Sequence, residues 1–80
     1  DLFVCECSFP DHLKMAGHLS PRWAGRLARE ARSRRLLLTH LYPACDAVDV
    51  AAACREEYDG DILVAEDLMR LRIPGAVATV

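Results

Sequence analysis

The sequence lacks most of the features that assign a protein to a class at first sight. Its 80 residues contain no internal repeat and no low-complexity tract. No apolar run approaches the roughly 20 residues of a membrane-spanning helix. The formal net charge of −2 gives no general attraction for nucleic acid. These absences argue against a membrane-spanning helix, a repeat protein and a nucleic-acid-binding protein that relies on overall positive charge.

The four cysteines also lack the spacing of a zinc module. Cys5 and Cys7 are separated by one residue, and Cys45 and Cys54 lie much later, so no C-x2-C pair is present. The sequence opens directly on a strand-like run and shows no secretory signal pattern. We therefore interpret the cysteines as ordinary intracellular thiols and expect a cytoplasmic protein.

What the sequence does have is a high apolar content for its length. Hydrophobic residues make up 52% of the chain, slightly above the usual range for soluble domains. A chain of this size forms one domain at most and buries only about 60% of its unfolded surface. So much apolar surface on a small chain indicates either a very efficient core or a surface that packs against a partner.

Apolar runs and helix-start signals predict alternating strands and helices. Ser20 is the expected N-cap of the first helix, with Pro21 at its first position, and Asp46 is the expected cap of a second helix that Gly60 ends. We expect strands at residues 1–6, 35–39, 61–65 and 68–73, helices at 20–33 and 46–60, and a loop at 8–19. The last strand should be an antiparallel edge strand, and residues 75–80 a frayed tail.

The order β-α-β-α-β-β predicts an α/β fold with both helices on one face of the sheet. Crossovers between parallel strands are right-handed, so two crossovers in the same direction place their helices on the same side. The strands are apolar on both faces, and the opposite face must therefore pack against another polypeptide segment. Because the chain opens almost inside its first strand, we expect a preceding part of the domain to be missing.

Three polar residues fall where ligands bind in open α/β sheets, at the carboxyl ends of strands. Glu6 ends the first strand, His40 follows the second, and His18 lies just before the first helix. A carboxylate beside a histidine fixes its tautomer and raises its basicity, which suits metal binding and acid–base chemistry. Each residue also has a simpler interpretation. His40 would cap a strand, His18 would be a solvated loop histidine, and Glu6 would be an exposed strand terminus.

Six arginines gather between residues 22 and 35. Arg22, Arg26 and Arg29 share one side of the first predicted helix. We interpret this arginine face as a solvated helix surface. The alternative is a surface that attracts a polyanion, whose binding would weaken with salt.

Three segments carry a resemblance to a known family. Residues 2–9 (LFVCECSF), 17–20 (GHLS) and 36–40 (LLLTH) resemble, in order and spacing, the C-terminal part of the metallo-β-lactamase fold. The likeness is greatest to the ribonuclease Z branch and to similar cyclic-nucleotide phosphodiesterases, and it covers roughly residues 1–74. It implies that the whole chain is the C-terminal half of an αββα sandwich.

The resemblance also implies roles for the three polar residues. His40 matches the last metal-ligand histidine of a two-zinc site, although other divalent metals are possible. His18 matches a histidine that protonates the leaving group or stabilises the scissile phosphate, and Glu6 matches its acidic partner. A metal-activated hydroxide attacks phosphorus in such enzymes.

The departures from the family pattern matter as much. The main metal motif, His-x-His-x-Asp-His, is absent, and Leu68 stands where a glycine commonly follows the aspartate. One histidine cannot hold two zinc ions. We therefore expect the 80 residues to be inactive alone and to need the N-terminal half of the same domain.

The leading hypothesis is thus part of a zinc-dependent phosphodiesterase that acts on RNA or cyclic nucleotides, in a homo-oligomer. One alternative is a noncatalytic α/β interaction module that dimerises through its bare sheet face. Another keeps the fold but hydrolyses a thioester, a lactone or a phosphonate ester. Fold alone does not decide between these chemistries.

Overall fold

The computed structural model describes residues 2–73 and 76–79. The described elements are β1 (Leu2–Glu6), α1 (Pro21–Glu30), β2 (Arg35–Thr39), α2 (Val50–Arg55), β3 (Asp61–Val64), β4 (Arg70–Ile73) and β5 (Ala76–Thr79). Two short 3-10 helices, Asp11–Leu13 and Pro43–Ala47, lie in the loops that follow β1 and β2. Within these ranges no helix is both long enough and apolar enough to cross a membrane.

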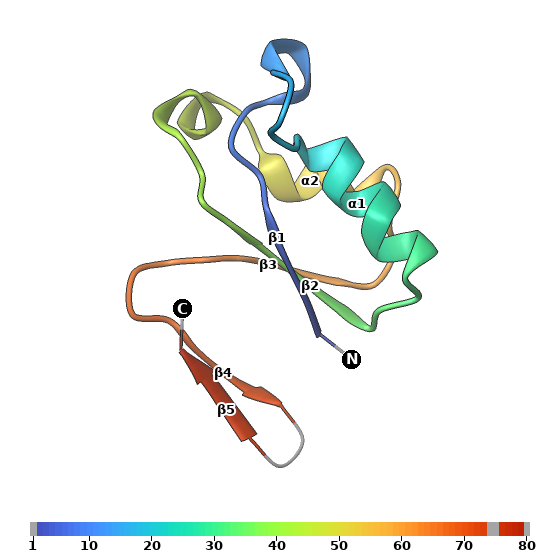
Figure 1. The fold of residues 1–80 in the computed structure, drawn as a ribbon, viewed down its shortest axis with the longest axis vertical. Coiled ribbons are helices and arrows are strands. Elements are labelled where there is room, and N and C mark those ends of the chain that lie inside the picture. The colour runs from blue at the N-terminus through green and yellow to red at the C-terminus, as the bar shows by residue number, and fades with distance from the viewer. Residues whose placement is uncertain (1, 74–75, 80) are drawn as a thin grey trace.

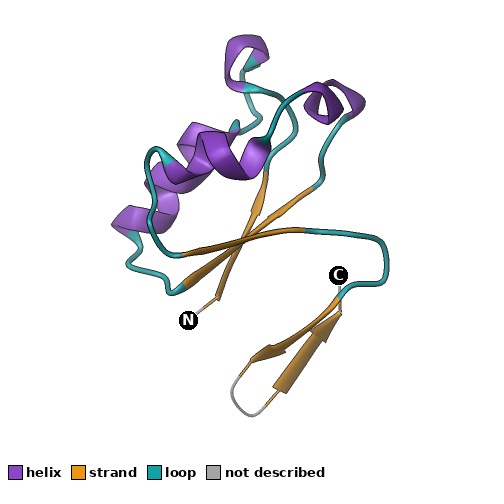
Figure 2. Ribbon diagram, turned by 180° about the vertical axis from the view of Figure 1, so that it is seen from behind, coloured by secondary structure: helices purple, strands orange, loops and turns teal. Residues whose placement is uncertain are grey.

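The first three described strands form a parallel sheet in the order β1-β2-β3. The helices α1 and α2 pack against each other and lie on one side of this sheet (Figures 1 and 2). This arrangement confirms the predicted α/β fold, with both helices on the same face of the sheet. It also brings the carboxyl ends of β1 and β2 together at one edge.

The core lies between the sheet and the helices. Leu36 and Leu38 of β2 are fully buried there, together with Ala24 and Ala28 of α1. Gly25 is required where α1 approaches α2, because a Cβ atom at this position would lie 2.6 Å from the carbonyl oxygen of Cys54. Small residues on α1 thus let the two helices come close and cover the sheet.

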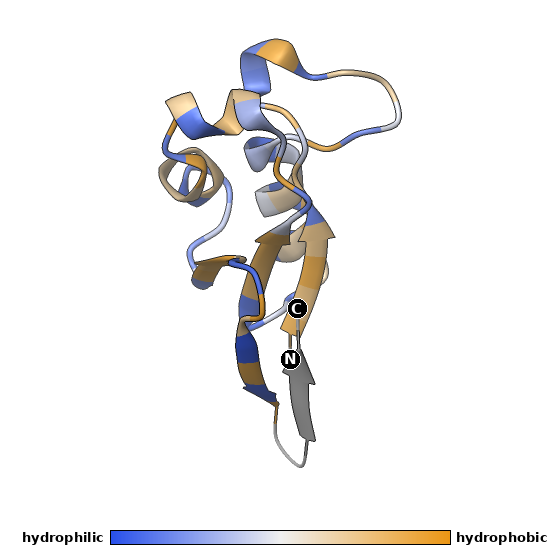
Figure 3. Cartoon of the chain, turned by 90° about the vertical axis from the view of Figure 1, so that its left-hand side faces the viewer, coloured by the Kyte–Doolittle hydropathy of each residue, from blue (hydrophilic) through white to orange (hydrophobic). Residues whose placement is uncertain are grey.

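The opposite face of the sheet is less completely covered. Val4, Leu37 and Leu63 are paired side by side across the three strands, and they alternate with the residues of the helix-side core. Leu37 is only 1% exposed, whereas Val4 is 52% exposed. Hydrophobic residues dominate the parallel strands, while β4 alternates between hydrophilic and hydrophobic residues (Figure 3). The far face is therefore closed at its centre and open on the β1 side.

The C-terminal hairpin differs from the prediction. We expected one antiparallel strand at 68–73 on the edge of the same sheet, but β4 pairs with β5 in a separate antiparallel sheet. Residues 76–79, expected to fray, form β5, whereas Pro74, Gly75 and Val80 lie outside the described residues. The turn before β4 redirects the chain: Met69 N–H donates to the Glu66 carbonyl at 3.0 Å. The hairpin thus forms a second sheet (Figure 1), and Arg35 of β2 contacts it, because its guanidinium donates to the Arg72 carbonyl at 2.9 Å.

Both helices are shorter than predicted. The helix α1 ends at Glu30, and Arg32, with φ of 55°, takes the left-handed conformation soon after it. The cap of α2 is Asp49, whose carboxylate accepts the Ala52 N–H at 3.0 Å. Asp46 lies instead in the preceding 3-10 helix. The prediction chose the wrong aspartate because both carry the same capping side chain.

The start of α1 is capped in an unexpected way. Ser20 occupies the N-cap position as predicted, but its buried hydroxyl has no hydrogen-bond partner among the described residues. Asp11 accepts the backbone N–H of Arg22 at 3.0 Å and so provides the side-chain cap. This contact ties the loop after β1 to the helix and helps to place His18 near the sheet edge.

Candidate functional site

Glu6, Ser8 and His40 converge where β1 and β2 end. Glu6 pairs with Thr39 in the sheet register, and the pairing continues beyond the strands because Cys7 N–H donates to the Thr39 carbonyl at 2.8 Å. The residues that follow each strand therefore leave the sheet side by side. The structure places Glu6 and His40 at this common edge, as the sequence predicted.

Ser8 connects Glu6 to His40. Its side chain is fully buried, and its Oγ lies 2.7 Å from Glu6 Oε2 and 3.2 Å from His40 Nδ1. The backbone N–H of Ser8 also donates to Glu6 Oε2, at 3.1 Å. The serine hydroxyl thus links the Glu6 carboxylate to the His40 imidazole. The sequence did not identify Ser8 as part of the site.

His18 reaches the same cluster from the loop after β1. The other oxygen of Glu6, Oε1, accepts the backbone N–H of Leu19 at 2.6 Å, and this bond draws the loop back to the strand end. His18 Nδ1 then lies 4.0 Å from Glu6 Oε2. The structure therefore brings together Glu6, His18 and His40, while their catalytic and metal-binding roles stay predictions.

Two aromatic rings fill the space between the histidines. The Tyr42 ring centroid lies 5.1 Å from that of His40 and 5.9 Å from that of His18. Phe9 makes edge-to-face contacts with both His18 and Tyr42, at 5.4 Å and 5.0 Å. Such contacts restrict how each ring can turn. His40 is held by this packing and by its hydrogen bond to Ser8, whereas the His18 ring is held by packing and lies 4.0 Å from Glu6.

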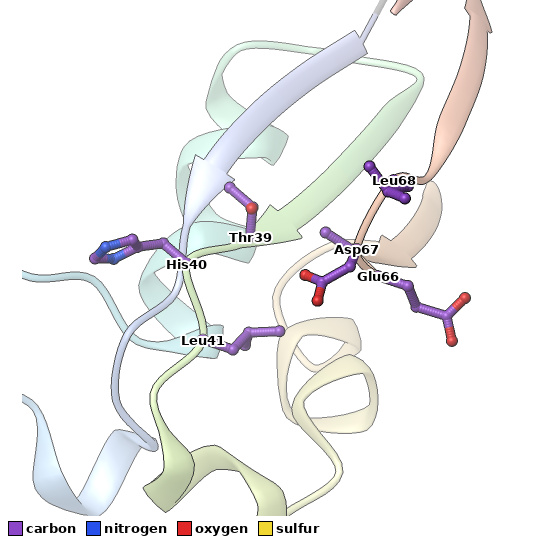
Figure 4. Close-up of a pocket in the computed structure, with 7 residues that line it drawn as sticks. Thr39, His40, Leu41, Glu66, Asp67 and Leu68 are labelled. Carbon is purple, nitrogen blue, oxygen red and sulfur yellow. The ribbon is translucent and has the colours of Figure 1, made fainter. Parts of the chain in front are cut away.

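His40 itself has an unusual backbone. Its φ is 57°, in the left-handed region that few residues other than glycine adopt. Strained conformations of this kind cluster at functional sites. Figure 4 shows the exposed His40 ring turned away from the side chains of Glu66 and Asp67.

A pocket of about 640 Å³ adjoins this strand end. Its lining comes from the tip of β2 and from the turn after β3: Thr39, His40, Leu41, Ala65, Glu66, Asp67 and Leu68. Leu68 is 84% exposed and has a φ of 63°. A glycine would adopt this conformation without strain, whereas a leucine rarely does.

The contacts around Glu6 keep its carboxyl group ionised. Burial acts to raise the pKa of Glu6, but hydrogen bonds from Ser8 and Leu19 and the nearby His18 outweigh burial and lower it below the usual value. A carboxylate in this state can accept hydrogen bonds and orient a neighbouring histidine. It is not suited to donate a proton near neutral pH.

The cysteines show no sign of reactivity. All four, which lie in the described part of the chain, carry free and buried thiols. Burial raises the pKa of Cys5 and Cys54 to about 11 and that of Cys7 to about 12. Burial also raises the pKa of Cys45, which donates its S–H to the carbonyl of Ser8 at 3.4 Å. Protonated thiols of this kind are poor nucleophiles and poor metal ligands.

The described residues can supply one metal ligand but not a whole metal site. No group of three histidine, cysteine, aspartate or glutamate side chains among residues 2–73 and 76–79 is placed to hold an ion. His40 fits the part of a single ligand. Its ring is exposed, and a hydrogen bond at Nδ1 leaves Nε2 available, as is usual for histidines that bind metals.

The arginine face of α1 is engaged in ion pairs. Arg22 pairs with Glu56, and Arg26 and Arg29 lie 3.6 Å and 3.4 Å from Glu57 Oε1. These acidic residues follow α2 in the sequence and neutralise part of the arginine charge. The contacts favour the interpretation of a solvated surface over that of a polyanion-binding face.

Sequence reasoning missed Ser8, Phe9 and Tyr42. A signal was available, because Ser8 lies two residues after Glu6, and Tyr42 lies two residues after His40. Residues just beyond the ends of neighbouring parallel strands meet at the same edge. Their contacts, however, depend on the path of the two loops, which the residue pattern does not specify.

Comparison with known proteins finds relatives named ribonuclease Z. The chain is 39% identical to ribonuclease Z of Haloferax volcanii, over 95% of this chain and 26% of that protein. It is 42% identical to ribonuclease Z of Salinispora arenicola, over 92% of this chain and 26% of that protein. No family model matches the chain.

A solved structure shows the same fold. The metallo-β-lactamase fold protein YhfI of Bacillus subtilis matches with a TM-score of 0.76 and 32% identity, over 82% of this chain and 28% of that one. The chain thus spans about a quarter of the length of the curated relatives that it matches. It resembles a C-terminal, ribonuclease Z-like segment with the metallo-β-lactamase fold, as the sequence motifs predicted.

Proposed function

We propose that this chain forms the C-terminal part of a zinc-dependent hydrolase that cleaves phosphodiester bonds in RNA. The observation that carries the proposal is His40, held at a strand tip by Ser8 with its Nε2 atom left available. Similarity to two proteins named ribonuclease Z supports RNA as the substrate. Similarity to a metallo-β-lactamase fold protein supports metal-dependent chemistry.

In this proposal the three polar residues have distinct roles. His40 would hold zinc through Nε2, and bound zinc would supply Lewis acidity and activate a water molecule. His18 donates a proton to the leaving oxygen or stabilises the scissile phosphate. Glu6 orients His18, from which it is separated by 4.0 Å, and also fixes the loop through Leu19.

The remaining ligands of a two-zinc site come from the other half of the domain. The chain covers about a quarter of its relatives, and the described residues contain no group of three side chains that could hold a metal ion. The β1 side of the open sheet face, where Val4 is half exposed, is suited to pack against that half. The 80 residues alone are then inactive.

The test uses histidine variants of the full-length protein. His40→Ala is expected to lower both the zinc content and the rate at which RNA and an aryl phosphodiester are hydrolysed. The loss should exceed the roughly 10–100-fold that is typical when a residue hydrogen-bonded to a metal ligand is removed. His18→Ala should keep zinc but lose about 10²–10⁴-fold in rate, as expected for a lost general acid. His12→Ala is the matched control, because His12 is exposed in a separate loop turn.

The comparison with His12→Ala decides the test. If His40→Ala retains the zinc content and rate of His12→Ala, the proposal is wrong. Cyclic nucleotides, a thioester, a lactone and a phosphonate ester in the same assay separate the alternative substrates. Sedimentation with and without a chelator measures the oligomer, since a noncatalytic module that dimerises through the open sheet face would be indifferent to zinc.

A further inference from the structure

We propose that Ser8 is a positioning residue that fixes the tautomer of His40. It keeps the ring proton on Nδ1 and leaves the lone pair of Nε2 directed outward. The tautomer of His40 follows from the protein's own hydrogen bonds and is independent of the proposed function. Only the expected effect of Ser8 on zinc binding rests on that function.

Both carboxylate oxygens of Glu6 accept hydrogen bonds from backbone N–H groups. Oε1 accepts the Leu19 N–H at 2.6 Å, and Oε2 accepts the Ser8 N–H at 3.1 Å. Both oxygens of Glu6 are therefore acceptors of backbone bonds, as in an ionised carboxylate, which has no proton to give. Any further contact of Oε2 must come from a donor.

The hydroxyl of Ser8 is that donor. Its oxygen lies 2.7 Å from Glu6 Oε2, a distance typical of a strong bond from a hydroxyl to a carboxylate. A hydroxyl has a single proton. Once this proton points at Glu6, Ser8 Oγ can only accept a hydrogen bond from another neighbour.

Among the described residues, the remaining hydrogen-bond partner of Ser8 Oγ is His40 Nδ1, at 3.2 Å. A hydrogen bond between these two atoms therefore requires the proton to be on Nδ1. In a neutral imidazole the other nitrogen, Nε2, then carries the lone pair. The direction of the bonds runs from His40 through Ser8 to Glu6, and it prepares His40 to act as a ligand through Nε2.

The backbone leaves little freedom to rearrange this chain of bonds. The Ser8 carbonyl accepts the Tyr42 N–H at 3.2 Å, so the segments that carry Ser8 and His40 are held together beyond the sheet. Tyr42 also packs on the His40 ring. The left-handed backbone of His40 persists because these surrounding contacts determine it.

The first experiment measures the tautomer. The full-length protein, labelled with ¹⁵N on histidine and freed of metal by a chelator, is examined by long-range ¹H–¹⁵N NMR near pH 8, where an ordinary imidazole is neutral. His40→Gln identifies the His40 signals by their loss. We expect a protonated Nδ1 in the wild type and a shift toward a protonated Nε2 in Ser8→Ala.

The second experiment measures zinc affinity in competition with a chelator. Ser8→Ala should bind zinc about 10–100-fold more weakly, because partners of this kind typically contribute that factor. Ser8→Thr keeps the hydroxyl and should restore both the tautomer and the affinity. Circular dichroism confirms that each variant is folded.

Two results would overturn the inference: a wild-type His40 with its proton on Nε2, or a Ser8→Ala variant with unchanged tautomer and unchanged affinity. The hydrolase assay separates this failure from that of the proposed function. An inactive wild type with the expected tautomer contradicts only the function, whereas an active wild type with the opposite tautomer contradicts only the role of Ser8.

Discussion

Two polar clusters in this small molecule show how differently charged residues can be used. The strand-end cluster consists of Glu6, Ser8, His18 and His40. The helix-surface cluster consists of the three arginines of α1 and two glutamates that follow α2: Arg22, Arg26, Arg29, Glu56 and Glu57. Both clusters join residues that are distant in sequence, yet only the first is anchored to the backbone.

The difference lies in the partners rather than in the burial of the carboxylates, because the side chain of Glu6 is 33% exposed and that of Glu57 is 21% exposed. Glu6 accepts three hydrogen bonds at the strand ends, two of them from backbone N–H groups, and Ser8 is fully buried. In the helix-surface cluster the side chains of Arg26 and Arg29 are 44% and 56% exposed. Water and salt weaken ion pairs between such flexible, exposed side chains, whereas the backbone N–H groups and the buried Ser8 hydroxyl fix the position of Glu6. The strand-end cluster can therefore hold a precise geometry, which chemistry requires.

The largest expected effect is the loss of Glu6. Glu6→Ala leaves the N–H groups of Ser8 and Leu19 without their acceptor, and we expect it to lower the free energy of unfolding by about 3 kcal/mol, since an unsatisfied buried group costs about 1–3 kcal/mol. Urea denaturation of the full-length protein measures the change. If Glu6→Ala lowers the free energy of unfolding no more than Glu57→Ala does, the two clusters do not differ in how firmly they are held.

The contrast also explains what the sequence could and could not predict. Glu6 and His40 were predictable, because each follows an apolar strand and parallel strands end at one edge. Ser8 was not, because its contacts depend on how the chain turns after β1. The partners of the arginine face were missed for a similar reason: the prediction placed Glu56 and Glu57 inside a longer second helix.

The C-terminal hairpin shows another limit of the sequence. The alternation in residues 68–73 correctly predicted an antiparallel strand, but the partner is β5, which follows Pro74-Gly75. Local alternation indicates that a strand forms and says nothing about which strand it pairs with. The left-handed conformation of Leu68, which redirects the chain before β4, is likewise invisible in the pattern because leucine rarely adopts it.

A smaller effect should follow from acid. The folded pKa of Glu6 lies below its ordinary value, so its bonds stabilise the fold above that ordinary value, and this contribution is lost as the pH falls through the folded pKa. We expect stability to decrease on acidification below about pH 4.5. The decrease should be shallower in Glu6→Gln, which cannot titrate. Parallel urea titrations at several pH values compare the two proteins, and identical slopes would contradict the assignment.

The smallest effect is expected in the helix-surface cluster. Glu57→Gln removes the charge that Arg26 and Arg29 share but keeps the size of the side chain, which lies beside Gly25 at the contact between α1 and α2. Exposed ion pairs contribute at most about 1 kcal/mol and are screened by salt. We therefore expect a loss below about 1 kcal/mol at low salt that disappears near 1 M sodium chloride. A double-mutant cycle with Arg29→Gln measures the coupling directly. A coupling that survives high salt would mean that this surface is organised as firmly as the strand ends, and the lack of backbone partners would then fail as the explanation of the difference.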